Sequence, residues 1–305
     1  LVGSEMCIRD RFGGSIGNWL GKLAHLDEFD HHVMIMCGMS AAFAAVFGTP
    51  MAAAVFAMEV VSVGVMYYAA LLPCVIASII AAEFATGMGI DPETFPVHSI
   101  PGLTVETGLK MALIAVGCGI LSILFCILLK TVGQLYTKYL KNPYIRIVVA
   151  AGVIILLTIC LNTKDYMGAG SGLIARAIEK GEARPLDFLW KMLLTALTMR
   201  AGYRGGEIVP AFSIGATFGC VAGGILGFSP ELAAAASMVA LFCGVTNCPI
   251  TAMLISFELF GFSGAAYYLI AISISYAVSG YYSLYKDQTI VYSKYKARYI
   301  NRKTR

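Results

Sequence analysis

Long apolar stretches separated by short polar ones run through almost the whole chain. Several could cross the roughly 30 Å hydrocarbon core of a bilayer as helices. They lie at about residues 50–86, 107–129, 144–161, 186–199, 208–227, 232–257 and 264–280. Glycine or proline interrupts many of them, which is expected where helices stop inside the membrane around a protected site. The pattern predicts an all-α, multi-pass membrane protein with discontinuous helices.

Composition and charge support this prediction. The chain is 58% hydrophobic and 13% charged, with a mean hydropathy of +0.77, outside the usual range of soluble proteins. Basic residues outnumber acidic ones near the C-terminus, which the positive-inside rule places in the cytoplasm. They are Lys286, Lys294, Lys296, Arg298, Arg302, Lys303 and Arg305, against Asp287 alone. So short a basic patch beside a membrane segment does not indicate nucleic-acid binding.

Two parts of the chain resemble each other. After a shift of 199 residues, Met39, Phe43, Pro50 and Glu59 align with Met238, Phe242, Pro249 and Glu258. After a shift of 198, Ser15, Gly17 and Gly21 align with Ser213, Gly215 and Gly219. An internal repeat of this length with broken helices is typical of transporters whose ion site lies between two inverted halves.

The repeat and the polar connections predict five segments. Residues 1–11 are polar and aperiodic and look foreign or truncated, and residues 12–88 form the remainder of the first inverted repeat. Residues 89–104 contain prolines and acids but no Lys or Arg, so we expect an extracellular linker. Residues 105–281 form the second inverted repeat, and residues 282–305 form a terminal helix and a basic cytoplasmic tail. A polar connection is expected from His25 to His32.

The stretch from Gly202 to Gly219 is the strongest candidate for a site. Gly205 and Gly206 allow a tight turn, and Pro210 suits the first turn of the apolar helix that follows. The free N–H groups at a helix start, together with the helix dipole, can hold an anion without a positive side chain. We therefore expect this helix start to bind an anion within the membrane.

Three sequence motifs, in this order and with the repeat, resemble the CLC family of voltage-gated chloride channels and anion/proton antiporters. They are Gly-Met-Ser-Ala-Ala-Phe-Ala-Ala-Val-Phe-Gly-Thr-Pro-Met-Ala at 38–52 with Phe-Ala-Met-Glu at 56–59, Gly-Gly-Glu-Ile-Val-Pro at 205–210, and a tyrosine-rich segment before the tail. The resemblance covers nearly the whole chain after residue 11. It implies the CLC inverted-repeat fold and a homodimer in which each subunit has its own pore.

The resemblance also implies site residues. The family binds dehydrated anions with main-chain N–H groups at helix starts and with one Ser and one Tyr hydroxyl. Here Gly206 sets the turn, the amides of Glu207 and Ile208 face the anion, and the tyrosine is Tyr282, with Tyr281 and Tyr285 as rivals. The bound halide is the only ligand implied, since neither a cofactor nor a metal is expected.

The sequence departs from the family pattern at its start. The family elements that carry the ion-binding Ser and the gating glutamate have no counterpart, and the second of them is expected just ahead of Phe12. We therefore expect that the chain lacks roughly the first third of a functional unit. That the chain by itself carries no transport is a third hypothesis, which an upstream Gly-x-Glu-Gly-Pro element ahead of Phe12 would test.

A further departure concerns protons. In the family's antiporters a proton-relaying glutamate directly follows the position of Glu59, and here that residue is Val60. Valine cannot carry a proton, which favours a passive channel. Glu59 itself is a candidate for proton transfer or gating, although a buried acid hydrogen-bonded to backbone is the favoured interpretation, as for Glu258.

Glu207 complicates this choice, because an ionised carboxylate in an anion-binding turn would repel the anion. The side chain either caps the helix or pairs, with Arg204 as a candidate partner, or it exchanges protons. The fluoride/proton antiporter branch of the family has a similar Gly-Gly-Glu-Val-Thr-Pro element, in which Val209 here replaces the Thr.

The leading functional hypothesis is therefore passive, CLC-type chloride conduction across the cell membrane. Fluoride/proton antiport by the same fold is the alternative. An intramembrane enzyme is disfavoured, because all four histidines lie in polar stretches and no catalytic arrangement lies in an apolar segment.

Overall fold

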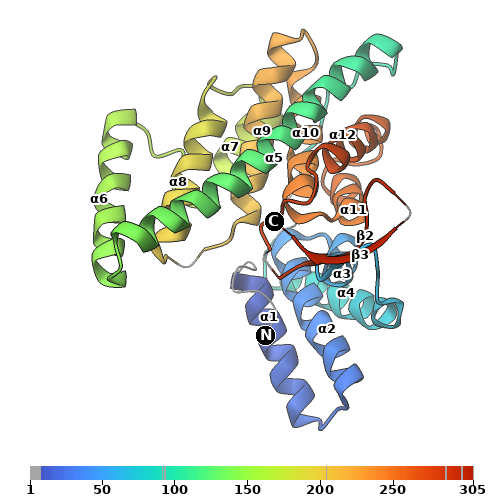
Figure 1. Cartoon of the computed structure of the whole chain (residues 1–305). Coiled ribbons are helices and arrows are strands. Elements are labelled where there is room, and N and C mark those ends of the chain that lie inside the picture. Colours follow the sequence, from blue (N-terminus) through green and yellow to red (C-terminus); the bar gives the residue numbers. More distant parts are fainter. Residues whose placement is uncertain are drawn as a thin grey trace. The chain divides into compact units, whose positions relative to one another are not determined.

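The computed structural model in Figure 1 describes residues 8–90, 92, 94–203, 205–285, 287–296 and 298–304. The chain divides into two compact units. Unit 1 comprises Leu1–Pro96, Thr246–Ala265 and Tyr285–Arg305, and unit 2 comprises Val97–Val245 and Ala266–Leu284. The units do not coincide with the repeats expected from the sequence, whose boundaries remain a prediction.

Unit 1 combines helices from both repeats with a small sheet. Its helices are α1 (Ile8–Leu23), α2 (Glu28–Phe47), α3 (Pro50–Glu59), the 3₁₀ helix η1 (Tyr68–Ala70), α4 (Leu71–Gly87) and α11 (Pro249–Phe260). Its strands are β1 (Ser62–Val63), β2 (Thr289–Tyr292) and β3 (Tyr299–Lys303).

Unit 2 is helical in its described residues. Its helices are α5 (Val105–Tyr139), α6 (Pro143–Leu161), α7 (Ser171–Glu179), α8 (Asp187–Ala201), α9 (Ile208–Ile225), α10 (Pro230–Thr246) and α12 (Ala265–Val278). α10 and α12 each extend one residue into unit 1.

The predicted discontinuous helices are confirmed. Among the described residues, five helical segments are long and apolar enough to cross a membrane: Glu28–Phe47, Tyr68–Gly87, Val105–Tyr139, Pro143–Leu161 and Ile208–Ile225. The apolar run at 50–86 breaks after Glu59, and the run at 232–257 breaks between α10 and α11 at Asn247, whose φ is 60°. Pro50 and Pro249 each begin the helix after a break, where the missing N–H of proline has no cost.

Close glycine packing recurs in both copies of the repeat. A Cβ added to Gly17 of α1 would lie 2.4 Å from the Met34 carbonyl oxygen of α2, and one added to Gly215 of α9 would lie 2.6 Å from the Ser237 carbonyl oxygen of α10. Real side chains do not come so close, so both helix pairs need glycine at the aligned position. This packing is what an internal repeat predicts.

Two expectations about local structure are wrong. α2 begins at Glu28, so His31 and His32 lie on a helix rather than in a polar connection. The start is fixed by Asp27, whose side chain accepts a hydrogen bond of 2.8 Å from the Asp30 amide. α1 begins at Ile8, inside the stretch 1–11 that looks foreign or truncated in the sequence.

The terminal helix expected from about Tyr281 is also wrong. Gly280, with a φ of 61°, follows the end of α12, and β2 and β3 come next. β2 pairs parallel to β1 and antiparallel to β3. The run Thr289-Ile290-Val291-Tyr292 consists of β-branched and aromatic residues, which favour a strand over a helix.

Candidate functional site

The start of α9 follows a turn that begins at the end of α8. Gly202, with a φ of 113°, ends α8, and Glu207 is the residue before the first helical position of α9. Glu207 and Ile208 are only 4% and 1% exposed, whereas Gly205 and Gly206 are partly exposed, so burial begins at Glu207. The Nε of Arg146 donates a 2.9 Å hydrogen bond to the carbonyl oxygen of Ala201, which ties α6 to the end of α8.

The Glu207 side chain pairs with an arginine and does not cap the helix. Its Oε1 lies 3.6 Å from an Nη of Arg200, which comes from the last turn of α8. As the N-cap residue it makes no side-chain capping hydrogen bond, so capping by Glu207 is wrong. Arg204, named as a possible partner, lies outside the described residues. The sequence missed Arg200, although its place just before the Gly-rich turn was visible.

A buried lysine and a glycine-rich loop support the side of α9, and sequence reasoning gave neither a role. Lys191 is 1% exposed, and its Nζ donates hydrogen bonds to the carbonyl oxygens of Tyr166 (3.1 Å) and Gly168 (2.8 Å). The Ser213 hydroxyl of α9 lies 3.1 Å from the Gly170 carbonyl oxygen. A Cβ on Gly170, whose φ is 92°, would lie 2.4 Å from the Ser213 Oγ. The loop therefore packs against α9, and the hydrogen bonds from Lys191 fix the position of the loop.

Tyr282 lies in the same hydrophobic cluster as α9. It packs, half-buried, against a cluster that includes Ala211 and Ile214 of α9 and Val245 of α10. The amide of Leu284 donates a 2.9 Å hydrogen bond to the Val245 carbonyl oxygen, which fixes the tyrosine segment at the end of α10. The role of Tyr282 in anion binding stays a prediction. Of its two rivals, Tyr281 is its neighbour, and Tyr285 belongs to unit 1.

Glu59 lies in unit 1 on the start of another helix. Its carboxylate accepts hydrogen bonds from the amides of Ile250 (3.1 Å) and Thr251 (2.9 Å) and from the Thr251 hydroxyl (2.6 Å). The interpretation of Glu59 as a buried acid hydrogen-bonded to backbone is therefore confirmed. A role in proton transfer or gating stays a prediction.

The residue that follows Glu59 lies beside hydrogen-bonded amide side chains. Val60 is 1% exposed, and its carbonyl oxygen accepts a 2.9 Å hydrogen bond from Nε2 of Gln288. The same Nε2 donates to the Thr246 carbonyl oxygen, and Asn247 donates to Oε1 of Gln288. These hydrogen-bonded amides at Val60 do not titrate near neutral pH, so they cannot replace a proton-relaying glutamate.

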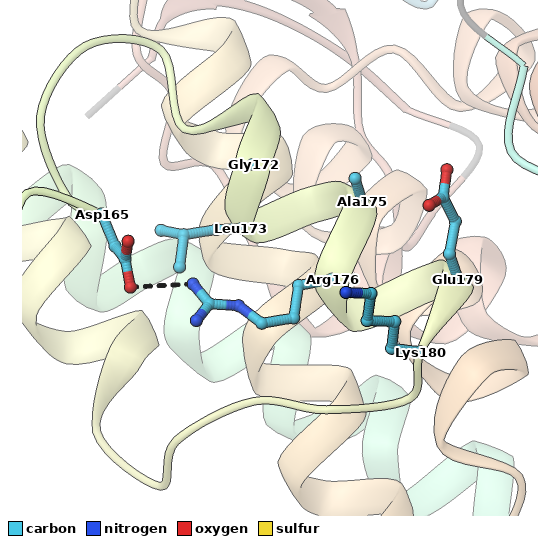
Figure 2. A pocket seen from close by; sticks show the side chains of 7 residues that line it. All are labelled: Asp165, Gly172, Leu173, Ala175, Arg176, Glu179 and Lys180. Atoms are coloured by element: carbon cyan, nitrogen blue, oxygen red, sulfur yellow. Dashed lines mark hydrogen bonds and ion pairs between the residues drawn. The ribbon is translucent and has the colours of Figure 1, made fainter.

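A separate polar pocket of about 390 Å³ lies along α7 in unit 2 (Figure 2). It is lined by Asp165, Gly172, Leu173, Ala175, Arg176, Glu179 and Lys180. An Nη of Arg176 lies 2.9 Å from Oδ2 of Asp165 and holds the pKa of that carboxyl below its ordinary value. Acidic and basic side chains share this pocket, and none of the site residues expected from the sequence lines it.

Comparison with known proteins identifies the family. The profile of the voltage gated chloride channel family matches residues 2–280. The chain is 32% identical over 294 residues to a chloride/fluoride channel protein of Pseudomonas syringae pv. tomato, a match that covers 93% of this chain and 64% of that protein. It is 27% identical over 265 residues to the H(+)/Cl(-) exchange transporter ClcA of Vibrio cholerae, covering 82% of this chain and 56% of that protein.

Solved structures agree with this match. The crystal structure of a CLC-type fluoride/proton antiporter matches with a TM-score of 0.88 and 31% identity, over 94% of this chain and 73% of that one. A slow cyanobacterial Cl-/H+ antiporter matches with a TM-score of 0.75 at 16% identity, over 91% of this chain and 68% of that one, which supports the fold alone. The chain spans less than two thirds of the length of both relatives compared by sequence. It belongs to the voltage gated chloride channel family, also called CLC.

Proposed function

We propose that the full-length protein moves small halide anions across the cell membrane and binds them at the start of α9. Gly206 sets the turn, the amides of Glu207 and Ile208 donate to the anion, and the Tyr282 hydroxyl supplies a further donor. Family membership, the burial of Glu207 and Ile208 and the packing of Tyr282 against α9 support the assignment.

The proposed ion is fluoride, and the proposed mode is exchange against protons. One observation carries this proposal: the buried Glu207 carboxylate lies in the turn itself and pairs with Arg200 at 3.6 Å without capping the helix. An anion at the amides of this turn would repel the ionised carboxylate, so anion binding favours the protonated side chain. Without an anion, Arg200 favours the ionised form. Anion binding and proton binding are linked in this way, and exchange further requires that the anion and the proton leave this turn toward opposite sides of the membrane.

The names of two relatives agree with fluoride. The Pseudomonas protein is called a chloride/fluoride channel protein, and the antiporter with 31% identity is a fluoride/proton antiporter.

Passive chloride conduction, the leading hypothesis from the sequence, is the second candidate. Val60 favours it, because neither a buried valine nor the hydrogen-bonded amides around it can relay a proton at that position. In this alternative Glu207 remains ionised and paired with Arg200 throughout conduction.

The remaining proposals concern the assembly. We infer a homodimer in a lipid bilayer with a cytoplasmic C-terminus, on the family resemblance and on the excess of basic residues near that end. Voltage gating remains a prediction. Nucleic acid and catalytic chemistry have no part in the proposal.

A flux assay in liposomes tests the choice. The full-length protein is reconstituted, an outward fluoride or chloride gradient is imposed, and anion efflux and internal pH are followed by electrode and dye. Coupled exchange predicts that an outward fluoride gradient alone, with no pH gradient imposed, drives protons into the liposomes, so that the internal pH falls. Chloride efflux without proton movement would establish the passive alternative.

A further inference from the structure

α3 and α11 of unit 1 each carry a glutamate that lies on the start of the other helix. Glu59, the last residue of α3, accepts hydrogen bonds from the first turn of α11. Glu258, near the end of α11, accepts hydrogen bonds of 2.9 Å from the amides of Met51 and Ala52 in the first turn of α3. The two glutamates align in the internal repeat, so the arrangement is reciprocal.

The donors around Glu59 are those expected of an anion site. Two main-chain amides and one hydroxyl converge on its carboxylate, at the positive end of a helix dipole. Glu59 is 6% exposed and Thr251 is fully buried, so water is largely excluded. The same kinds of donor are proposed to hold the halide at α9.

Helix capping alone does not require charged side chains from a distant part of the chain. The N-cap residues are Thr49 and Cys248, and neither makes a side-chain capping bond. A local Ser, Asp or Asn is the usual solution and is worth about 1 kcal/mol. Here both helices instead receive a carboxylate from a residue about two hundred positions away in the sequence, as the pairs Glu59–Thr251 and Glu258–Ala52 show. A carboxylate meets two donors at once and adds a full negative charge that repels other anions.

We propose that Glu59 and Glu258 act as built-in anions, which keep mobile halide ions from binding at the starts of α11 and α3. They are thus specificity-determining residues that confine the halide to the start of α9. The inference rests on the proposed function, because it takes a halide as the ion that must be excluded. It assigns a latent halide site to the amides of Ile250 and Thr251 and the Thr251 hydroxyl.

The test uses full-length protein crystallised in bromide, whose anomalous scattering locates the ion. In Glu59→Ala the carboxylate is gone but its three donors remain, so we expect a bromide peak at the start of α11. In Glu59→Gln the amide side chain still fills the site, so we expect none, as in the unchanged protein. Absence of bromide from the α11 start in folded Glu59→Ala would overturn the proposal.

A second variant keeps the test decisive if Glu59→Ala does not fold. Glu258→Ala opens the start of α3, where Met51 is 50% exposed, and should also admit bromide. In solution, saturating chloride should raise the melting temperature of either variant by about 3 °C or more beyond its effect on the unchanged protein. An equal chloride effect in variant and unchanged protein would count against the proposal.

The bromide map also separates this inference from the proposed function. Bromide at α9 in the unchanged protein supports the proposed site, whatever happens at α11. Bromide at α11 in Glu59→Ala, with none at α9 in any form, would support the exclusion role and contradict the α9 site.

Discussion

Removal of the arginine that faces Glu207 should reveal how strongly the two charges depend on each other. At 3.6 Å, two unit charges attract by about 5 kcal/mol with an effective dielectric constant of 20. The contact is longer than a charge-assisted hydrogen bond, and the Arg200 side chain is 15% exposed, so we expect a smaller effect. Arg200→Met should lower the free energy of unfolding by about 2–3 kcal/mol, because it leaves a buried carboxylate without this partner.

A double-mutant cycle measures the coupling. Arg200→Met, Glu207→Gln and the double variant are unfolded in mixed detergent micelles at pH 7. The double variant leaves neither charge behind. Its loss of unfolding free energy should therefore be smaller, by about 2 kcal/mol, than the sum of the losses in the two single variants. Single losses that add to within about 0.5 kcal/mol would refute the ion pair.

Three further predictions test the packing and the polar pocket. Gly38→Ala should lower the free energy of unfolding by about 3 kcal/mol, because its Cβ would lie 2.1 Å from a carbonyl oxygen of α1. Gly152→Ala, in open space on α6, is the control and should be neutral or stabilise by up to about 1 kcal/mol in the same unfolding measurement. Oxidation by copper phenanthroline and oxygen should form a disulfide between Cys37 and Cys74, whose sulfurs lie 4.0 Å apart. Mass spectrometry should then show the loss of two hydrogens. Two thiols that stay free would contradict the packing of α2 on α4. Asp165→Asn should cost less than about 1 kcal/mol at pH 7. Because an arginine lowers the pKa of Asp165, this contribution should start to decline as the pH falls below about 4 and should be lost only below the lowered pKa. An acid limb of melting temperature against pH that is the same in Asp165→Asn and the unchanged protein would refute the ion pair.

The apolar runs predicted from hydropathy correspond to helices in the structure. The apolar runs, their breaks at Pro50 and Pro249, and the alignment of Glu59 with Glu258 could be read from residue types alone. They could be read because membrane helices need long apolar runs, and because a repeat conserves the residues that hold its helix starts.

Other features depend on contacts that no local pattern shows. Arg200 and Lys191 meet the ends of other segments only after α8 is packed, so their partners could not be named from the sequence. The sheet was missed because β1 is only two residues long and its partner β2 lies over two hundred residues later in the chain. His31 was misplaced because a single Asp cap at Asp27 started the helix within a polar run.

The position of Glu207 was predicted, but its behaviour was not. The Gly-Gly turn and Pro210 located the helix start, where Glu207 and Ile208 are buried. The choice between capping and pairing depended on the direction of one side chain, which the structure shows toward Arg200.

The central claim, that Glu207 links anion binding to proton binding, is tested most directly by proton movement through Glu207→Gln. The full-length variant is reconstituted in liposomes with a fluoride gradient beside the unchanged protein and Glu182→Gln, which removes an exposed carboxylate elsewhere. We predict that the unchanged protein and the Glu182 variant move protons in exchange for fluoride, and that Glu207→Gln keeps fluoride flux but loses proton movement. Proton movement that persists in Glu207→Gln, or that is absent from the unchanged protein, would contradict the account.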